Sequence, residues 1–128
     1  MSQIEKEFFH LLDNGLKDTL SAGNIGIEKE SLRVEDISIA QSSHFKSLGS
    51  ALCNRFITTD FSEALTELIT PPFTNRLECI NFLENLHHFV QNNIEQQTLW
   101  PYSMPPFFDN DSLIPIANYG SSNQAKFK

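Results

Sequence analysis

Residues 24–35 alternate with a period of two, and this pattern restricts the fold more than any other feature of the chain. Two sets of side chains project in opposite directions: Ile25, Ile27 and Lys29 on one face, and Gly26, Glu28, Glu30 and Leu32 on the other. Period two is the side-chain repeat of a β-strand, whereas a helix repeats every roughly 3.6 residues. Because a strand needs a hydrogen-bonded neighbour, the chain must build a sheet around this segment.

Three further segments have strand character. Residues 37–41 form a short return strand after the first one, and residues 55–59 and 64–70 form two more. Pro71 and Pro72 stop the last of them, because proline has no N–H to give to a sheet ladder. The sheet is therefore small, and its short connections favour antiparallel pairing.

Two helices accompany these strands. Residues 3–20 repeat apolar side chains at helical spacing, and Ser2 with Glu5 forms a capping box, although Asn14-Gly15 is a weak point within the helix. The longer helix spans residues 75–97, with Thr74 as its N-cap. Its predicted apolar stripe consists of Leu77, Ile80, Leu83, Leu86, Val90 and Ile94.

After Trp100 the chain contains four prolines and no clear period. The predicted fold class is α+β, a small antiparallel sheet with packed helices, and residues 1–128 form a single domain.

The charge balance excludes several function classes. Nine Lys and Arg residues against sixteen Asp and Glu residues give a net charge of −7, whereas nucleic-acid binders and proteins of anionic membranes carry basic surfaces. No apolar run approaches the roughly 18 residues needed to span a bilayer, and the first residues lack the features of a signal peptide. With two cysteines and no disulfide framework, we expect a cytoplasmic protein without nucleic-acid or membrane partners.

Four acidic residues occupy unusual positions. Glu28 and Glu30 project from the same face of one strand, Glu67 interrupts an apolar face between Leu65 and Ile69, and Asp60 ends another strand. Like charges held this close repel one another unless a cation lies between them, and Mg²⁺ prefers carboxylate oxygens. The alternative is a solvated face, with Glu67 paired to Arg33 or Arg55.

Other reactive side chains carry weaker signals. His87 and His88 are adjacent on a helix and point in different directions, which is typical of surface histidines rather than metal ligands. Cys53 and Cys79 are predicted to be buried thiols without a catalytic role. Ser121 and Ser122 form an ordinary polar turn or a phosphate-contacting one.

Five segments together carry a family resemblance. In chain order they are GIEKESLR (residues 26–33), LGSAL (48–52), ITTDFSEALTELITP (57–71), WPYSMP (100–105) and YGSSN (119–123). The set resembles the glutamate–cysteine ligases of the proteobacterial type, which are carboxylate–amine ligases with a fold related to glutamine synthetase. Lys29 stands where that family commonly has arginine, on the face away from the acidic residues.

The resemblance implies an enzyme that makes γ-glutamylcysteine from glutamate, cysteine and ATP, the first step of glutathione biosynthesis. ATP is the co-substrate, Mg²⁺ is the cofactor, and γ-glutamyl phosphate is the intermediate. By the same resemblance, Glu28, Glu30, Glu67 and Asp60 are metal ligands. Phe61 corresponds to a wall of the pocket for the substrate cysteine, or is an ordinary core residue. Ser103 and Asn123 lie in matching motifs without an assigned role.

Members of this family are several times longer than 128 residues, so the chain corresponds to an amino-terminal segment of their catalytic domain. We expect such a segment to be inactive alone, because phosphoryl transfer depends on groups that position nucleotide and glutamate. The remainder of the ligase is then its partner. The alternatives are a truncated remnant, a split subunit that binds metal or a partner chain, or a small acidic domain without a site.

Overall fold

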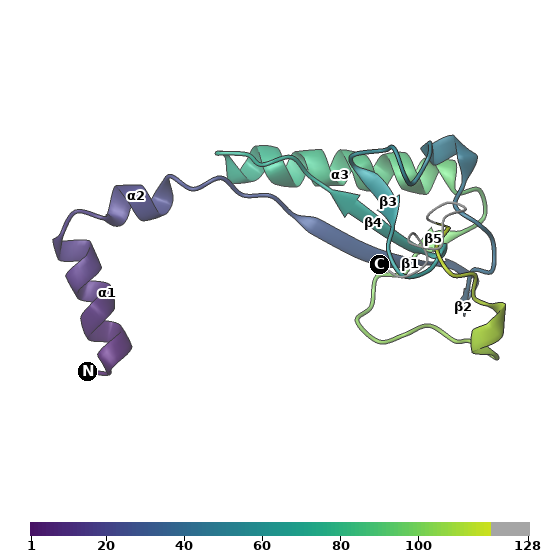
Figure 1. Ribbon diagram of the computed structural model, residues 1–128, viewed down its shortest axis with the longest axis horizontal. Coiled ribbons are helices and arrows are strands. Elements are labelled where there is room, and N and C mark those ends of the chain that lie inside the picture. Colours follow the sequence, from purple (N-terminus) through teal and green to yellow (C-terminus); the bar gives the residue numbers. More distant parts are fainter. Residues whose placement is uncertain (119–128) are drawn as a thin grey trace.

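The computed structural model describes residues 1–118, except for the side chains of Leu20 and Ser21. The predicted turn at Ser121 and Ser122, and Asn123, lie outside the described residues. A five-stranded sheet carries one long helix on one face (Figure 1). Its elements are α1 (Gln3–Asp13), α2 (Lys17–Ser21), β1 (Glu28–Glu35), β2 (Ser38–Ile39), β3 (Ile57–Thr59), β4 (Leu65–Ile69), α3 (Arg76–Asn93) and β5 (Thr98–Leu99), with 3-10 turns at Lys46–Leu48 and Asp111–Leu113.

Strand β1 organises the sheet. The strand order is β2-β1-β4-β3, β5 also pairs with β1, and each of these strand pairings is antiparallel. Glu30 of β1 pairs with Glu67 of β4, and Ile57 of β3 pairs with Leu68 of β4. The predicted α+β class, the antiparallel sheet and the strands around residues 28–35, 57–59 and 65–69 are confirmed.

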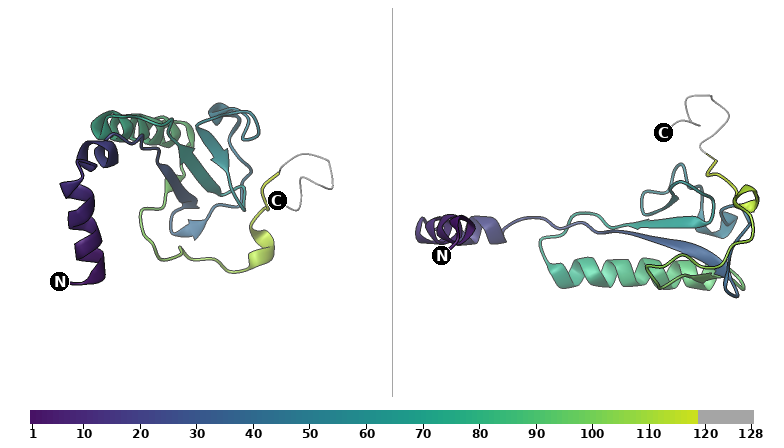
Figure 2. Two further views of the ribbon diagram at one scale, coloured as in Figure 1. Left: turned by 60° about the vertical axis from the view of Figure 1, so that its left-hand side comes forward. Right: turned by 90° about the horizontal axis from the view of Figure 1, so that it is seen from below.

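Helix α3 packs along one face of the sheet and forms the core with it (Figures 1 and 2). Its N-cap is Asn75, whose side chain accepts a hydrogen bond from the Leu77 amide at 2.9 Å, so the prediction of Thr74 was wrong by one residue. The core cluster joins α3 to β3, β4, β5 and the first 3-10 turn through Leu48, Ile57, Leu68, Val90, Ile94 and Leu99. Cys79 is fully buried on the same helix, as predicted.

The first two residues of the predicted stripe on α3 do not pack against the core, whereas Leu83 and Leu86 do. Leu77 is 72% exposed and Ile80 is also exposed, whereas Val90 and Ile94 are fully buried. Each residue of a helix is rotated by roughly 100° from the one before it. Leu77 and Leu86 are nine residues apart, so they lie about half a turn from each other around the helix axis. The prediction was wrong here because a strict spacing of three drifts around the helix.

The amino-terminal helix is shorter than expected and does not pack on the sheet. The capping box of Ser2 and Glu5 is present, but α1 ends at Asp13 and Gly15 adopts a φ of 70° before α2 begins. Helix α1 lies beyond the end of β1, and none of its residues is buried within the described part of the chain (Figure 2). Its apolar side chains, including Ile4 and Phe8, are exposed. None of the helices within residues 1–118 is long and apolar enough to cross a bilayer.

The end of α3 also differs from the prediction. The helix stops at Asn93, four residues earlier than expected, and Glu95 adopts a left-handed φ of 55°. The chain then returns as β5, and the Trp100 amide donates to the Leu32 carbonyl at 2.8 Å. This strand was missed because two residues are too few to show an alternating pattern.

Arg33 is fully buried and connects four parts of the fold. Its guanidinium donates to the Ser42 hydroxyl (3.0 Å), to the carbonyls of Ser42 (2.9 Å) and Glu63 (2.7 Å), and to the side chain of Gln97. Burial lowers the pKa of Arg33 to about 10, and the Glu63 carboxylate opposes that shift, so the side chain stays charged at neutral pH. A buried charge is tolerated only when its donors find acceptors; here both terminal nitrogens of Arg33 find them, whereas its Nε has no partner among the described residues.

We predict that Arg33→Lys destabilises the fold by about 3 kcal/mol, because an ammonium cannot reach the acceptors that the planar guanidinium fork serves together. Chemical denaturation measures this change. The matched control is Arg55→Lys, at an exposed position, which we expect to alter stability by less than about 0.5 kcal/mol. Equal effects of the two substitutions would contradict the role assigned to Arg33.

Candidate functional site

The register of the sheet brings the predicted acidic residues together. Glu30 lies directly opposite Glu67 in the β1–β4 pair, and Glu28 lies two residues from Glu30 on the same face. Thr58 of β3 lies opposite Glu67 on its other side, and Asp60 follows two residues later. Directly paired residues share a face, so the four carboxylates project from one side of the sheet.

This face is the one that α3 leaves uncovered. Along β4, Thr66 and Leu68 are fully buried and point toward α3, whereas Glu67 is half-buried on the opposite side. Glu28, Glu30 and Asp60 are exposed. We call Glu28, Glu30, Asp60 and Glu67 the carboxylate face. Its sequence signal was the period of two, which correctly placed Glu28 and Glu30 on one face of their strand.

The other three carboxylates of this face repel the Glu67 carboxylate. Burial raises the pKa of the Glu67 carboxyl group, and the negative charges of Glu28, Asp60 and Glu30 raise it further, in that order. Repulsion of this kind favours binding of a proton or a metal cation.

The alternative pairings of Glu67 are absent from the described residues. Arg33 points to the other face, where it binds carbonyl groups, and no ion pair joins Glu67 to Arg33 or Arg55 within residues 1–118. Lys29, the charged neighbour on β1, also points away, and its ammonium donates to the Ser31 hydroxyl. Within the described residues, Glu67 is therefore not neutralised by these cations.

Mg²⁺ prefers oxygen ligands such as carboxylates, so the side chains of the carboxylate face are chemically suited to bind this ion. Within residues 1–118, however, no three His, Cys, Asp or Glu side chains already converge as a metal site. The exposed side chains of Glu28, Glu30 and Asp60 would have to rotate toward the ion. The structure thus brings the predicted ligands onto one face without arranging them as a finished coordination sphere.

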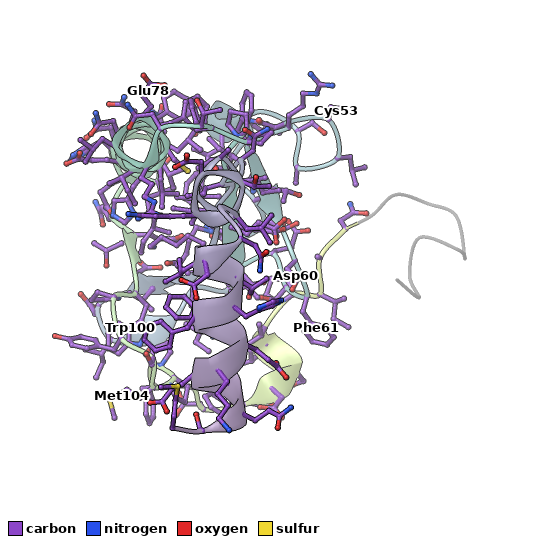
Figure 3. The ribbon with its side chains drawn as sticks, turned by 90° about the vertical axis from the view of Figure 1, so that its left-hand side faces the viewer. Cys53, Asp60, Phe61, Glu78, Trp100 and Met104 are labelled. Carbon is purple, nitrogen blue, oxygen red and sulfur yellow. The ribbon has the colours of Figure 1, made fainter. Side chains whose placement is uncertain are left out.

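Phe61 follows Asp60 directly and is 73% exposed, so the alternative of an ordinary core phenylalanine is wrong (Figure 3). The prediction of a buried Cys53 was also wrong, since this thiol is exposed on the loop before β3. His88 is exposed and forms an ion pair with Glu84 at 3.7 Å, as expected for a surface histidine. His87 is half-buried, and burial, Lys29 and His88 lower its pKa.

Sequence reasoning missed a second buried acid, Glu63. One carboxylate oxygen accepts the His44 amide at 2.7 Å, and the other accepts the Asn118 amide at 2.5 Å. These bonds fix the loop between Asp60 and β4 to two distant segments. The signal was weak, because Glu63 lies in a turn where no periodicity distinguishes a buried acid from a solvated one.

The chain is similar to known proteins. The protein-family model described as glutamate-cysteine ligase matches residues 8–128. A curated glutamate–cysteine ligase of Alcanivorax borkumensis is 46% identical over this whole chain, which covers 25% of that protein. One from Hahella chejuensis is 50% identical over 80% of the chain and 20% of its own length. The chain thus spans about a quarter or less of these relatives.

Two solved structures are similar as well. The glutamate–cysteine ligase of Francisella tularensis in complex with AMP gives a TM-score of 0.73 at 41% identity, covering 81% of this chain and 21% of the other. A bifunctional glutathione synthetase from Pasteurella multocida gives a TM-score of 0.78 at 33% identity, covering 86% of this chain and 16% of the other.

The raised pKa of Glu67 predicts a pH dependence of stability. The folded state holds the Glu67 proton more tightly than the unfolded state, so this group's contribution falls as pH rises from about 4.5, its ordinary value, through the raised pKa. We expect Glu67→Gln to be more stable than the parent chain at pH 7, with the difference shrinking toward pH 4. Denaturation across this range measures it. Glu35→Gln, exposed at the far end of β1, is the control and should show no such gain.

Proposed function

Because the chain belongs to the glutamate–cysteine ligase family, we propose that it contributes to joining the γ-carboxylate of L-glutamate to the amine of L-cysteine. The reaction is the ATP- and Mg²⁺-dependent first step of glutathione biosynthesis. One observation supports this assignment above the others: the carboxylate face collects three acids around Glu67, and their negative charges add to burial in raising the pKa of its carboxyl group. The two free thiols fit a reducing compartment such as the cytoplasm.

The chemistry proceeds in two displacements. A γ-carboxylate oxygen of glutamate attacks the γ-phosphorus of ATP, and the bond to the bridging oxygen breaks to release ADP. The cysteine amine then attacks the acyl carbon of γ-glutamyl phosphate, phosphate leaves, and the amine nitrogen loses a proton. When bound, Mg²⁺ supplies positive charge that offsets the phosphate oxygens.

The residues of this chain have three tasks in the proposal. Glu67, at the centre of the face, would hold the metal together with Glu28 and Glu30, and Asp60 is the fourth candidate ligand. A cation there removes the repulsion that raises the pKa of Glu67. Phe61, exposed beside Asp60, offers an apolar surface to the side chain of the substrate cysteine. The groups that hold the nucleotide would come from sequence that the relatives have beyond the matched segment.

A chimera tests the proposal. Residues 1–128 replace the matched segment of the Alcanivorax borkumensis relative, and ADP release is measured with glutamate, cysteine, ATP and Mg²⁺. We expect turnover that requires all four components. Glu28→Gln and Glu67→Gln should each lower kcat by about 100-fold or more, because each removes a charge that holds the metal.

Two controls accompany the chimera. Glu35→Gln, on the same strand but outside the carboxylate face, should leave turnover within about twofold of the parent. The 128-residue chain alone should release no more ADP than its own Glu28→Gln variant. Near-normal turnover of both the Glu28→Gln and Glu67→Gln chimeras at saturating Mg²⁺ would refute the metal assignment. An inactive but folded parent chimera would instead favour a remnant without catalytic function.

The role of Phe61 gives a separate prediction for the same chimera. Phe61→Ala should raise the KM for cysteine about tenfold while the KM for ATP stays within about twofold, because the lost ring contacts one substrate only. Steady-state kinetics with each substrate varied in turn measures both constants. Leu52→Ala, another exposed apolar side chain, is the control and should change neither. Equal increases in both constants would remove Phe61 from the cysteine pocket.

A further inference from the structure

The backbone groups of β1 point alternately to its two edges, and only one of these edges is paired along the whole strand. In an antiparallel sheet, the N–H and C=O of one residue point to the same edge, and those of the next residue point to the other. The Thr70 amide donates to the Ile27 carbonyl at 2.9 Å, so the odd-numbered residues of β1 face β4. The N–H and C=O groups of Glu28 and Glu30 therefore point to the opposite edge.

Strand β5 covers only the far end of this opposite edge. Its two residues pair with Arg33 and Val34, and the Trp100 amide donates to the Leu32 carbonyl at 2.8 Å. Within residues 1–118, no strand pairs with this edge of β1 before Leu32, and the first half of β1 forms the border of the sheet (Figure 1). We call this edge, along residues 28–31, the open edge of β1.

An open edge can take up a further strand. Its N–H and C=O groups are a template on which an extended segment pairs, and main-chain hydrogen bonds then hold that segment. Glu28 and Glu30 are both exposed, so the described part of the chain does not cover these groups. Charged side chains protect some sheet edges from pairing, and a permanently solvated edge is the alternative.

A pocket on the α3 side lies at the same border of the sheet. It has a volume of about 310 Å³, and its described lining residues are Lys29, Ile80, Leu83, Glu84, His87 and His88. Ile80 is 50% exposed there although it is apolar. The other flank of α3 is filled, because Phe82 packs against Phe56 and Phe73 with 5.3 Å and 5.6 Å between ring centroids. The helix thus leaves apolar surface uncovered on the side of the open edge.

A second copy of this chain fits the open edge poorly. Two copies of β1 that pair antiparallel along this edge would place Glu28 and Glu30 of one copy directly opposite the same residues of the other. Like charges directly opposite each other destabilise a pair of strands. The joined carboxylate faces would add to the repulsion that already raises the pKa of Glu67. The occupant therefore differs in sequence from β1.

We propose that the open edge of β1 binds an extended segment from the part of the ligase that lies outside this chain, which adds a strand to the sheet. The Alcanivorax borkumensis relative matches the whole chain with 25% of its own length, so most of that protein remains to supply the segment. Alternate side chains of the added strand would enter the pocket at Ile80 and Leu83, and we expect these to be apolar. The others would lie beside Glu28 and Glu30 and carry no acidic group. The inference rests on family membership and not on the proposed reaction.

Amide hydrogen exchange reads the two edges of β1 separately. It is measured by mass spectrometry with fragmentation that resolves single residues. In the 128-residue chain, we expect the amides of Lys29 and Ser31, which face β4, to be protected, whereas those of Glu28 and Glu30 exchange freely. In the chimera with the Alcanivorax borkumensis relative, exchange at Glu28 and Glu30 should slow by about 100-fold or more, because these amides then donate to the added strand.

Three results would overturn the inference. Free exchange at Glu28 and Glu30 in a folded chimera would mean that the edge stays solvated. Protection of both amides in the 128-residue chain that rises with protein concentration would identify a second copy as the occupant. Protection there that does not depend on concentration would identify a segment of this chain. The intact Alcanivorax borkumensis ligase, measured at the positions aligned with Glu28 and Glu30, gives the same test without the chimera.

A pair of variants tests the pocket under the open edge. In the chimera, Ile80→Glu should lower the protection of the Glu28 and Glu30 amides by about tenfold or more, because a carboxylate would enter the apolar surface that the added strand covers. The matched control is Phe89→Glu. Phe89 is 47% exposed and lies nine residues along α3 from Ile80, about half a turn around the helix axis, so its variant should stay within about twofold of the parent.

Far-UV circular dichroism checks that both variants fold. Equal losses of protection in the two variants would contradict the placement of the added strand over this pocket. Protection of Glu28 and Glu30 does not require turnover, so this test is independent of the proposed function. A folded chimera that protects both amides but releases no ADP would support the added strand and count against the proposed reaction.

Discussion

One buried guanidinium group organises this fold, because its N–H groups need hydrogen-bond acceptors. Arg33 is fully buried on the α3 side of β1, and its partners come from the loop at residues 42–43, from Glu63 and from Gln97. Removing a charged side chain from water is costly unless its donors find acceptors, as the two terminal nitrogens of Arg33 do. Those three segments must therefore converge on β1. Because Arg33 is fixed on one side of β1, the even-numbered residues of this strand project from the other side.

The position of Arg33 has an electrostatic consequence. The side of the sheet with the buried cation gains the core and α3, while Glu28, Glu30 and Glu67 gather on the side that α3 leaves open. Lys29 alternates with these acids but points away from them, so it does not offset their repulsion. The fold carries an unfavourable concentration of negative charge around Glu67, and in our proposal the binding of a metal ion relieves it.

Sequence patterns predicted the strands well and the packing of the helices poorly. Period two correctly placed Glu28 and Glu30 on one face of β1, because the side chains of a strand point in only two directions. The stripe on α3 was wrong at Leu77 and Ile80, since a helix offers many directions and the partner surface selects among them. The pattern of residues 3–20 correctly predicted a helix, but α1 buries none of its residues within the described part of the chain. Cys53 followed no periodic pattern, and its exposure could not be predicted from its neighbours.

The sequence alone determined which residues alternate, that Pro71 and Pro72 stop a strand, and that Glu28, Glu30 and Glu67 share strands with apolar residues. These are local properties, set by backbone geometry within a few residues. Only the tertiary structure decided that Glu30 lies opposite Glu67, that α3 stops at Asn93 so that Gln97 reaches Arg33, and that Trp100 lies beside Leu32. Those outcomes depend on pairings between segments tens of residues apart. The physical reason is that a buried polar group needs a hydrogen-bond partner, and a residue far away in the sequence can supply it.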